Sequence, residues 1–479
     1  MNKRAAARTA LCVPALSIAL ALGCSGAFIV PNPPAGASEE AHKKTKEPPL
    51  PDRRVVTGEL DFSKAFDDWE EPRDTSAGAH AARAQAVRSL RYPPVKLRTR
   101  PVRVMVRQGV GEAAVYSSAP AHLRAGKTNT TFRGRMHLQA VYGGAAATAV
   151  ATVGRAKKEL PLPCTLYVSS AGANLLELGE NSYRGALAVT PEEGGGISFI
   201  NILDMEDYLR GVVPLEIGNL KDGDIEAVKA QAVAARTYAY RRMAHREAGA
   251  FDLTHTVSDQ VYGGANAEAP VSDMAIRLTK DLVMAYEDGL ISAYYHSTCG
   301  GRTANVEDVW GGEAYPYLRS VSDAAPNGKA YCSESGSFSW TEKWSVGRLA
   351  GTIRRYSAEG NLNPPFGAGA LRSVEVKERF ECGRVKTLSV VSGAGEHVTG
   401  GDKARFLLRR DGSNQILRSA KFNSARISGG EAVITGGGYG HGIGMCQVGA
   451  IGRARAGQDF EHILRAYYSG ISIRSVVPE

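Results

Sequence analysis

Alternating apolar and polar positions predict β-strands from about residue 97 onward. In VKLRTRPVRVMVRQG, Val102, Val104 and Val106 fall on the same face, which is the two-residue period of a half-buried strand. Further short apolar runs, separated by glycine-rich turns, follow along the chain. We therefore expect residues 97–202 to form a β-rich part of the fold.

A helical pattern replaces this alternation after residue 202. Between Asp224 and Glu247, apolar residues recur every three or four positions, which is typical of one face of a helix. Most of them are alanine, so the helix can approach a neighbour closely; the stripe consists of Ile225, Val228, Ala232, Ala235 and Ala239. We expect residues 203–345 to hold the helices and the active site.

The remaining patterns complete an α+β fold. LVMAYEDGLISAYYHS joins two apolar runs through an Asp-Gly pair, which predicts a hairpin whose second strand delivers His296 at its exit. Strands are expected again over 372–435, within a β-rich C-terminal part at 346–475, and a short closing helix over 459–468. The fold class is α+β, with β-rich modules and a helical insert that forms a groove.

The first 24 residues have the layout of a secretory signal peptide. A basic start is followed by an apolar stretch from Ala10 to Leu22 and then by small residues. The segment ends in Ala-Leu-Gly-Cys, which resembles a bacterial lipobox in which Cys24 becomes lipidated; lipidation and simple cleavage both remain open. We expect an exported protein of the cell envelope, periplasmic or at the outer surface, that meets the membrane only through this signal peptide or a lipid anchor.

A tether is expected between this segment and the folded part. Residues 25–57 are rich in proline, alanine and charge and poor in large apolar residues, a composition typical of disorder. Residues 58–96 are uncertain, with a helix expected around Ala79–Leu90. Neither segment carries a chemical motif.

The charge of the chain narrows the class of partner. The formal net charge is +9, which suits an anionic partner, although evenly spread Lys and Arg are also typical of an ordinary solvated surface. The sequence has no zinc-finger spacing, basic helical stripe or RNP-like aromatic pattern. We therefore expect no nucleic-acid partner.

Glu216 is the candidate general acid. It lies in LDMEDYLRGVVPLEIG between Leu215 and Ile217, whose apolar side chains would raise its pKa by desolvation, as a general acid requires. Pro214, two residues earlier, is expected to turn the chain and fix the direction of the carboxylate. The alternative is an exposed glutamate near a helix start, where it would stabilise the helix dipole.

YYHSTCGGRT places His296 three residues before Cys299, and the sequence leaves three interpretations of this pair. Both residues can bind zinc together with Cys332, Cys299 and Cys332 can form a disulfide, or the thiols can be free. Export favours the disulfide, because an oxidising compartment pairs cysteines. A thiol nucleophile at Cys446, five residues after His441, is disfavoured because its surroundings match no known signature for that chemistry.

Two further stretches can contact a ligand. GGGYGHGIGMCQVGA is either a turn between strands or a shaped loop that presents Tyr439, His441 and Gln447. On the predicted helix, Arg236 is either a salt-bridge partner or a group that orients a sugar, and Tyr238 follows it two residues later.

Taken together, these motifs resemble the SpoIID/LytB family of bacterial cell-wall proteins over roughly residues 97–475. The matching pieces occur in the family's order: YRGAL, LDMEDYLRGVVPLEIG, EAVKAQAVAARTYAY, AYYHSTCGGRTANVEDVWGG, PYLRSV, GYGHGIGMCQVGA and ILRAYYSG. The resemblance implies a lytic transglycosylase that acts on peptidoglycan glycan strands, or an enhancer of an N-acetylmuramoyl-L-alanine amidase. The catalytic glutamate of the family's Val-Pro-x-Glu motif corresponds to Glu216.

The resemblance also sets expectations for the other residues. A lytic transglycosylase needs one carboxylate, because a hydroxyl of the substrate replaces water as the nucleophile. No cofactor is expected, although zinc has been associated with some members through Cys and His near the HS…GG stretch. The residues expected to contact the glycan are Arg236, Tyr238, His296, Ser297, Tyr439, His441 and Gln447, and Cys299 and Cys332 are the expected disulfide.

Overall fold

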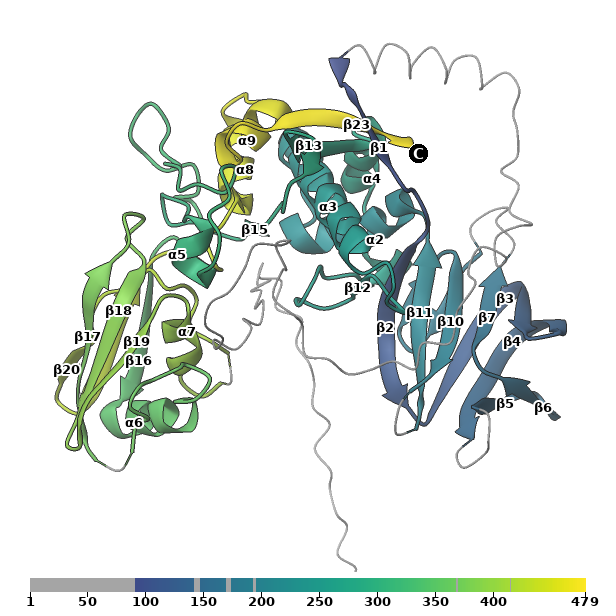
Figure 1. Ribbon diagram of the computed structural model, residues 1–479, viewed down its shortest axis with the longest axis horizontal. Helices are drawn as coiled ribbons and strands as arrows, with labels where there is room; N and C mark the ends of the chain where they lie inside the picture. The colour runs from purple at the N-terminus through teal and green to yellow at the C-terminus, as the bar shows by residue number, and fades with distance from the viewer. Residues whose placement is uncertain (1–90, 142–146, 169–173, 193–194, 368, 414) are drawn as a thin grey trace, which may run out of the picture.

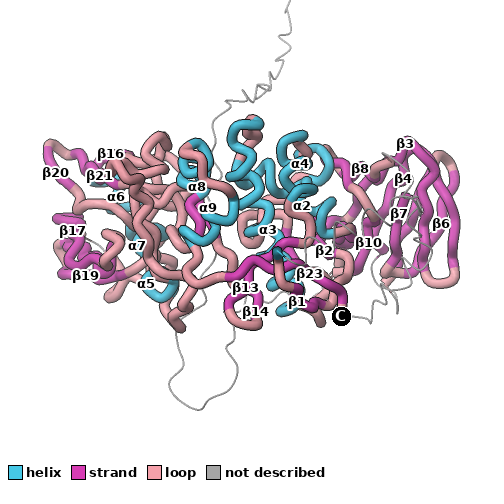
Figure 2. Tube along the Cα trace, turned by 90° about the horizontal axis from the view of Figure 1, so that it is seen from above, coloured by secondary structure: helices cyan, strands magenta, loops and turns pink. Residues whose placement is uncertain are grey.

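The computed structural model describes residues 91–141, 147–168, 174–192, 195–367, 369–413 and 415–479 (Figure 1). The expected signal peptide, the tether and the helix around Ala79–Leu90 lie outside the described residues. Strands at both ends of the molecule flank a helical centre (Figure 2), which confirms the expected α+β class. None of the helices in the described part of the chain combines the length and the apolar character that a membrane crossing requires.

A large, mostly antiparallel sheet forms the N-terminal part. Its strand order is β12-β2-β11-β10-β7-β3-β4-β5-β6, with β8 and β9 attached at β3. Every residue of β11 is buried, so both faces of this strand belong to the core. The strands are β2 (Val102–Val110), β3 (Glu112–Ala125), β4 (Thr128–Val141), β5 (Thr148–Val153), β6 (Ala156–Pro161), β7 (Cys164–Val168), β8 (Leu176–Leu178), β9 (Asn181–Tyr183), β10 (Ala186–Pro191), β11 (Ile197–Leu203) and β12 (Leu253–Thr254).

Helix α3 is the axis of the central part. The alanine stripe predicted between Asp224 and Glu247 forms this helix (Ile225–His245), and its alanines from 227 to 239 are fully buried. Such small side chains leave room for the four helices that contact α3. These are α2 (Met205–Ile217), α4 (Pro270–Leu278), α8 (Gln447–Arg455) and α9 (Phe460–Tyr467), the last being the expected closing helix.

The turn expected at Pro214 is not formed. Helix α2 passes through Pro214 and ends at Gly218, whose φ of 92° stops it, so Glu216 lies in the last helical turn. Proline removes one helical hydrogen bond, but α2 is held on its other faces by α3 and α4. The direction of the Glu216 carboxylate is therefore set by a helix rather than by a turn.

The predicted hairpin is also shorter than expected. Strand β13 (Leu282–Tyr286) pairs with β14 (Gly289–Leu290), which ends well before His296. His296 belongs instead to β15 (Tyr295–His296), which pairs in parallel with β22 (Met445–Cys446). The other edge of β13 pairs with β23 (Ser472–Pro478), and β23 pairs in turn with β1 (Pro94–Leu97).

The C-terminal part has a hydrophobic core of its own, which includes Trp344 and Phe422. Two three-stranded sheets, β16-β21-β20 and β17-β18-β19, surround it together with α6 and α7 (Figure 1). These elements are β16 (Trp340–Ser345), α6 (Val346–Arg355), β17 (Leu371–Arg379), β18 (Val385–Ser392), β19 (Gly395–Gly400), α7 (Lys403–Leu407), β20 (Arg426–Ser428) and β21 (Glu431–Gly436); α5 (Val306–Trp310) precedes them.

Candidate active site

Glu216 is a buried carboxyl group at the end of α2. Its side chain is 7% exposed, and burial raises its pKa to about 7. The Val261 amide donates to Oε1 at 2.9 Å, and together with the nearby side chains of Tyr295 and Gln447 it lowers the pKa in part. The apolar neighbour Leu215 is 40% exposed, so the rest of the fold, rather than the adjacent side chain, desolvates the carboxyl.

A short series of side-chain hydrogen bonds lies next to this carboxyl. Gln260 Nε2 donates to the Tyr295 hydroxyl at 2.9 Å, and the Tyr208 hydroxyl donates to Gln260 Oε1 at 3.0 Å. Burial raises the pKa of Tyr208 and Tyr295 well above the usual tyrosine value, so both stay neutral donors. The network therefore positions polar hydrogen atoms beside Glu216 without adding a charge.

Helix α8 brings Gln447 to the same place. Gln447 Nε2 donates to Gln231 Oε1 on α3 at 3.4 Å, and both amides are buried. Two buried polar atoms in this area have no hydrogen-bond partner among the described residues, namely Glu216 Oε2 and Gln231 Nε2. Because unsatisfied buried polar atoms are costly, we expect Oε2 to be the atom that meets an external group.

The glycine-rich loop packs two histidines against each other. The His296 and His441 ring centroids are 5.5 Å apart. His441 Nε2 bonds to the Tyr295 carbonyl at 2.9 Å and Nδ1 to the Ile443 amide at 3.0 Å, which makes Nε2 the protonated nitrogen. Burial lowers the pKa of His296 to about 3 and that of His441 well below the usual value. Both rings are therefore neutral near pH 7 and serve as hydrogen-bonding groups, not as cations.

Glycine is required in this loop where other chain segments approach it. Gly442 has a φ of 88°, and a Cβ atom there would overlap the guanidinium of Arg384. Gly440 has a φ of 102°, and its Cβ would lie 3.0 Å from His296 Cβ. The glycines thus allow the loop to lie against the His296 segment, so the stretch is more than a turn between strands.

Tyr439 belongs to this loop, and Ser297 directly follows His296 in the segment that the loop contacts. The backbone of Tyr439 exchanges hydrogen bonds with that of Thr298 at 2.7 and 3.0 Å, and its side chain is half-buried. The half-buried Ser297 accepts a hydrogen bond from the Val448 amide at 3.0 Å through its carbonyl. The glycan contacts expected of both residues stay predictions.

In the structure, Arg236 is a salt-bridge partner. Its side chain is fully buried and forms a two-pronged ion pair with Glu206, at 2.8 and 2.6 Å. A third bond, of 3.1 Å, goes to the Leu282 carbonyl. These contacts hold the guanidinium inside the fold and make Arg236 a salt-bridge partner, and the substrate contact expected of it stays a prediction. Tyr238 is 9% exposed and packs edge-on against Tyr294, and its substrate contact stays a prediction.

The expected disulfide is not formed. Cys299 and Cys332 are free thiols with their sulfur atoms 3.5 Å apart, whereas a disulfide holds them at about 2.0 Å. The reason is a larger cluster, because Cys446 and Asp323 converge on the same point. His296 does not belong to this cluster, and its Nδ1 bonds to the Ile443 carbonyl at 3.1 Å.

Sequence reasoning missed several residues of the site. Gln231, Gln260, Tyr208 and Asp323 appear in ordinary helical or loop patterns and carry no local signal. Trp310 could have been found, because it belongs to the motif AYYHSTCGGRTANVEDVWGG. Its ring centroid lies 5.1 Å from that of His441.

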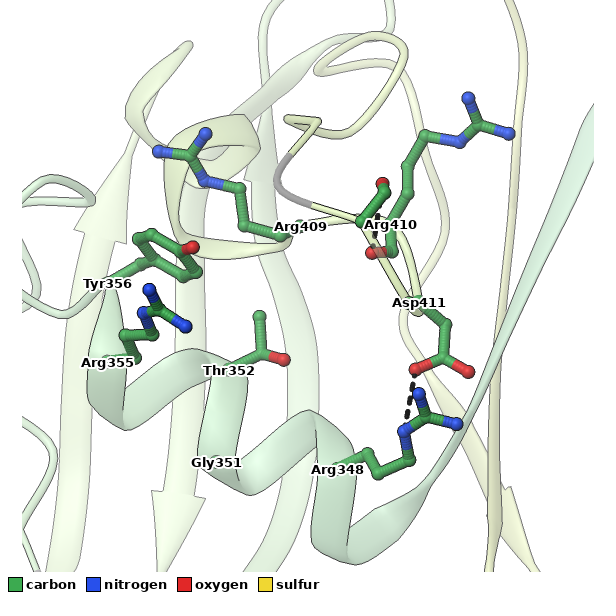
Figure 3. A pocket seen from close by; sticks show the side chains of 10 residues that line it. Arg348, Gly351, Thr352, Arg355, Tyr356, Arg409, Arg410 and Asp411 are labelled. Carbon is green, nitrogen blue, oxygen red and sulfur yellow. Dashed lines mark hydrogen bonds and ion pairs between the residues drawn. The ribbon is translucent and has the colours of Figure 1, made fainter. Parts of the chain in front are cut away.

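A hollow of about 450 Å³ lies on the C-terminal part (Figure 3). Arg348 pairs with Asp411 at 3.1 Å and Arg410 with Glu342 at 2.9 Å. Arg409 lies over the Tyr356 ring and pairs with a further glutamate. Because these arginines already have partners, we assign the hollow no ligand.

Comparison with known proteins places this geometry in a family. Residues 193–286, which contain Glu216 and α3, match the family described as Stage II sporulation protein. The Stage II sporulation protein D of Bacillus amyloliquefaciens is 30% identical over 287 residues, which cover 57% of this chain and 74% of that protein. The chain belongs to the SpoIID family.

Two other proteins similar to this chain have names that do not refer to sporulation. An uncharacterized protein of Brachyspira hyodysenteriae is 32% identical over 292 residues, which cover 61% of this chain and 72% of the relative. The amidase enhancer of Bacillus subtilis is 28% identical over 302 residues, but these cover only 40% of that longer protein. Residues 329–444 match a domain of unknown function (DUF8618), so most of the C-terminal part lies outside the SpoIID match.

Proposed function

We propose that this protein cleaves peptidoglycan glycan strands as a lytic transglycosylase, with Glu216 as the single general acid and base. The observation that carries the proposal is the buried carboxyl of Glu216, whose pKa is raised to about 7. At neutral pH such a group is present in both its protonated and its ionised form, which is what alternating acid and base steps require. The sporulation and amidase-enhancer names of the relatives support a role at the cell wall.

The reaction proposed for Glu216 has two proton transfers. The protonated carboxyl first gives its proton to the oxygen that joins N-acetylmuramic acid C1 to the next sugar, and that bond breaks. The carboxylate then takes the proton from the C6 hydroxyl of the same muramic acid, whose oxygen bonds to C1. The product is a 1,6-anhydro ring, and Glu216 is left protonated for the next cycle. The nucleophile is already attached to the electrophile, an advantage of up to about 7–11 kcal/mol.

The surroundings of Glu216 suit this use of a single carboxylate. Oε1 is held by the Val261 amide, which leaves Oε2 to exchange the proton. Asp259, two residues before Val261, is not a second acid. Burial disfavours its charged form, but Arg246 and Arg242 outweigh that effect and lower its pKa. Asp259 is therefore a permanently ionised, paired group.

A second function is favoured by the burial of the same carboxyl. Because Glu216 is only 7% exposed, a glycan must displace part of the site wall before it reaches Oε2. A protein that binds the wall and enhances an N-acetylmuramoyl-L-alanine amidase needs no such access. The name of the Bacillus subtilis relative supports this alternative, with an amidase as partner. Either function places the protein outside the cytoplasmic membrane, which agrees with the export predicted from residues 1–24.

One experiment separates the two functions. The purified protein is incubated with denuded glycan strands and with intact sacculi, and the products are analysed by mass spectrometry for 1,6-anhydro ends. We expect these ends from the wild type and from Glu177→Gln, a matched change at an exposed position, but not from Glu216→Gln. Equal product from Glu216→Gln would refute its role. No product from the wild type, combined with faster release of stem peptides by an added amidase, would establish the enhancer.

A further inference from the structure

Three sulfur atoms and one carboxylate oxygen converge beside the active site. The ligand atoms of Cys299, Cys332, Cys446 and Asp323 all lie within 4.8 Å of one another, and all four residues are buried. They come from three separate segments: the loop after β15, the stretch before β16, and the start of α8. A buried group of thiols and a carboxylate needs a reason, because burying such groups without a partner is unfavourable.

Two of the separations within the cluster fit a tetrahedral metal site. The Cys299 and Cys332 sulfur atoms are 3.5 Å apart, and Cys299 Sγ is 3.5 Å from Asp323 Oδ2. A tetrahedral zinc ion with zinc–sulfur distances of about 2.3 Å sets its sulfur ligands about 3.8 Å apart. The observed separations are much closer to this value than to a disulfide bond.

Backbone amides are already directed at the sulfur of Cys446. The Cys299 amide donates to it at 3.2 Å, and the Gly449 amide in the first turn of α8 donates at 3.3 Å. Amide donors and the positive end of a helix both favour a thiolate over a thiol.

Outer groups orient the carboxylate and offset the negative charge. The Tyr467 hydroxyl donates to Asp323 Oδ1 at 2.6 Å, and Arg453 lies 3.6 Å from the same atom. Oδ2 accepts a hydrogen bond from the Cys332 amide at 3.1 Å and lies 3.5 Å from Cys299 Sγ. Lys421 and Arg384 bond to backbone carbonyls at Gly300 and Cys299, which places two more cations around the cluster. Such outer-shell partners are typical of metal sites.

We propose that Cys299, Cys332, Cys446 and Asp323 bind one structural zinc ion. Sulfur donors select zinc over magnesium or calcium, and four protein ligands close the coordination sphere, as in structural sites. The ligand set differs from the one that the family resemblance suggested, because His296 is outside it. Since Gln447 directly follows Cys446, the ion fixes the start of the helix that presents Gln447 to Glu216.

The test measures metal and thiols in the full chain purified without chelator. We expect one zinc ion per chain by elemental analysis. When the protein is unfolded, Cys299, Cys332 and Cys446 should all react with the alkylating reagent as free thiols. Cys446→Ser and Asp323→Asn should weaken zinc binding beyond the roughly 10–100-fold loss caused by outer-shell changes. Cys164→Ser removes a buried thiol in β7, outside the cluster, and should keep the zinc.

A second measurement does not depend on the variants folding. Cobalt exchanged into the wild type should give the intense visible absorption of a tetrahedral cobalt–thiolate centre, and zinc should remove it. A Cys299–Cys332 disulfide in the alkylated peptides, or full zinc content in both ligand variants, would overturn the proposal. Because metal content and thiol state are read directly, either result is independent of whether the protein cleaves glycan.

Discussion

Replacing Glu216 with glutamine is expected to stabilise the protein above neutral pH while it abolishes glycan cleavage. The carboxyl is desolvated in the folded protein and solvated in the unfolded chain, so the two states release its proton at different pH values. Below pH 4.5 the group is protonated in both states and costs nothing. From there to about pH 7 the unfolded chain loses its proton while the folded protein keeps it, so stability falls as pH rises.

The size of this effect follows from the two pKa values. Each pH unit between the unfolded value of 4.5 and the folded value of about 7 contributes about 1.4 kcal/mol, which gives about 3 kcal/mol in total. Above pH 7 both states are ionised and the penalty stays constant. Glutamine has the same shape, still accepts the bond from the Val261 amide and never ionises, so its variant avoids the penalty.

The assay is urea unfolding at a series of pH values for the wild type, Glu216→Gln and the exposed control Glu177→Gln. The difference in unfolding free energy between Glu216→Gln and the wild type should grow by about 3 kcal/mol from about pH 4.5 to about pH 7 and then level off. The control should run parallel to the wild type. A Glu216→Gln curve that also runs parallel would show that Glu216 titrates normally, and the general-acid argument would lose its basis.

Three further changes test other parts of the site. Arg236→Met leaves a partly buried carboxylate without its partner, and we expect a loss of about 3–5 kcal/mol in urea unfolding; an unchanged midpoint would show that the ion pair is dispensable. Tyr295→Phe removes a group that lowers the pKa of Glu216, so the alkaline limb of the activity profile should move to higher pH, and a shift to lower pH would contradict the network. Gly442→Ala should lower the melting temperature far more than Gly429→Ala, since both glycines have positive φ but only Gly442 meets other atoms; equal losses would reduce the effect to backbone strain.

Patterns with a short period predicted the fold class and its principal helix. The alanine stripe of α3 and the strand at Val102 depend only on neighbouring residues, and the structure has both elements. The half-buried alternation is wrong, because the first five residues of β2 are all buried. The shift of the Glu216 pKa was expected as well, although its cause is the surrounding fold rather than Leu215. The helix through Pro214 was missed because local turn preference was overridden by packing.

The composition of the site could not be predicted in the same way. Gln447 and Gln231 are 216 positions apart, and Cys446 lies 147 positions from Cys299. No local spacing encodes such pairs, so the sequence suggested a disulfide across the loop-rich stretch between Cys299 and Cys332. The partner of Arg236 could not be identified for the same reason, because Glu206 is 30 residues away on another helix.

The position of β23 has a consequence for when the protein can fold. This strand, the last described along the chain, lies between β1 and β13 rather than at an edge of its sheet, and α8 and α9 cover α3 shortly before it. While the chain is being made, the part of α3 that α8 and α9 contact therefore stays exposed until more than 200 further residues have emerged. Contacts this distant along the chain form slowly and leave apolar surface exposed in the meantime. Gln447 can therefore meet Glu216 only after nearly the whole chain has been made.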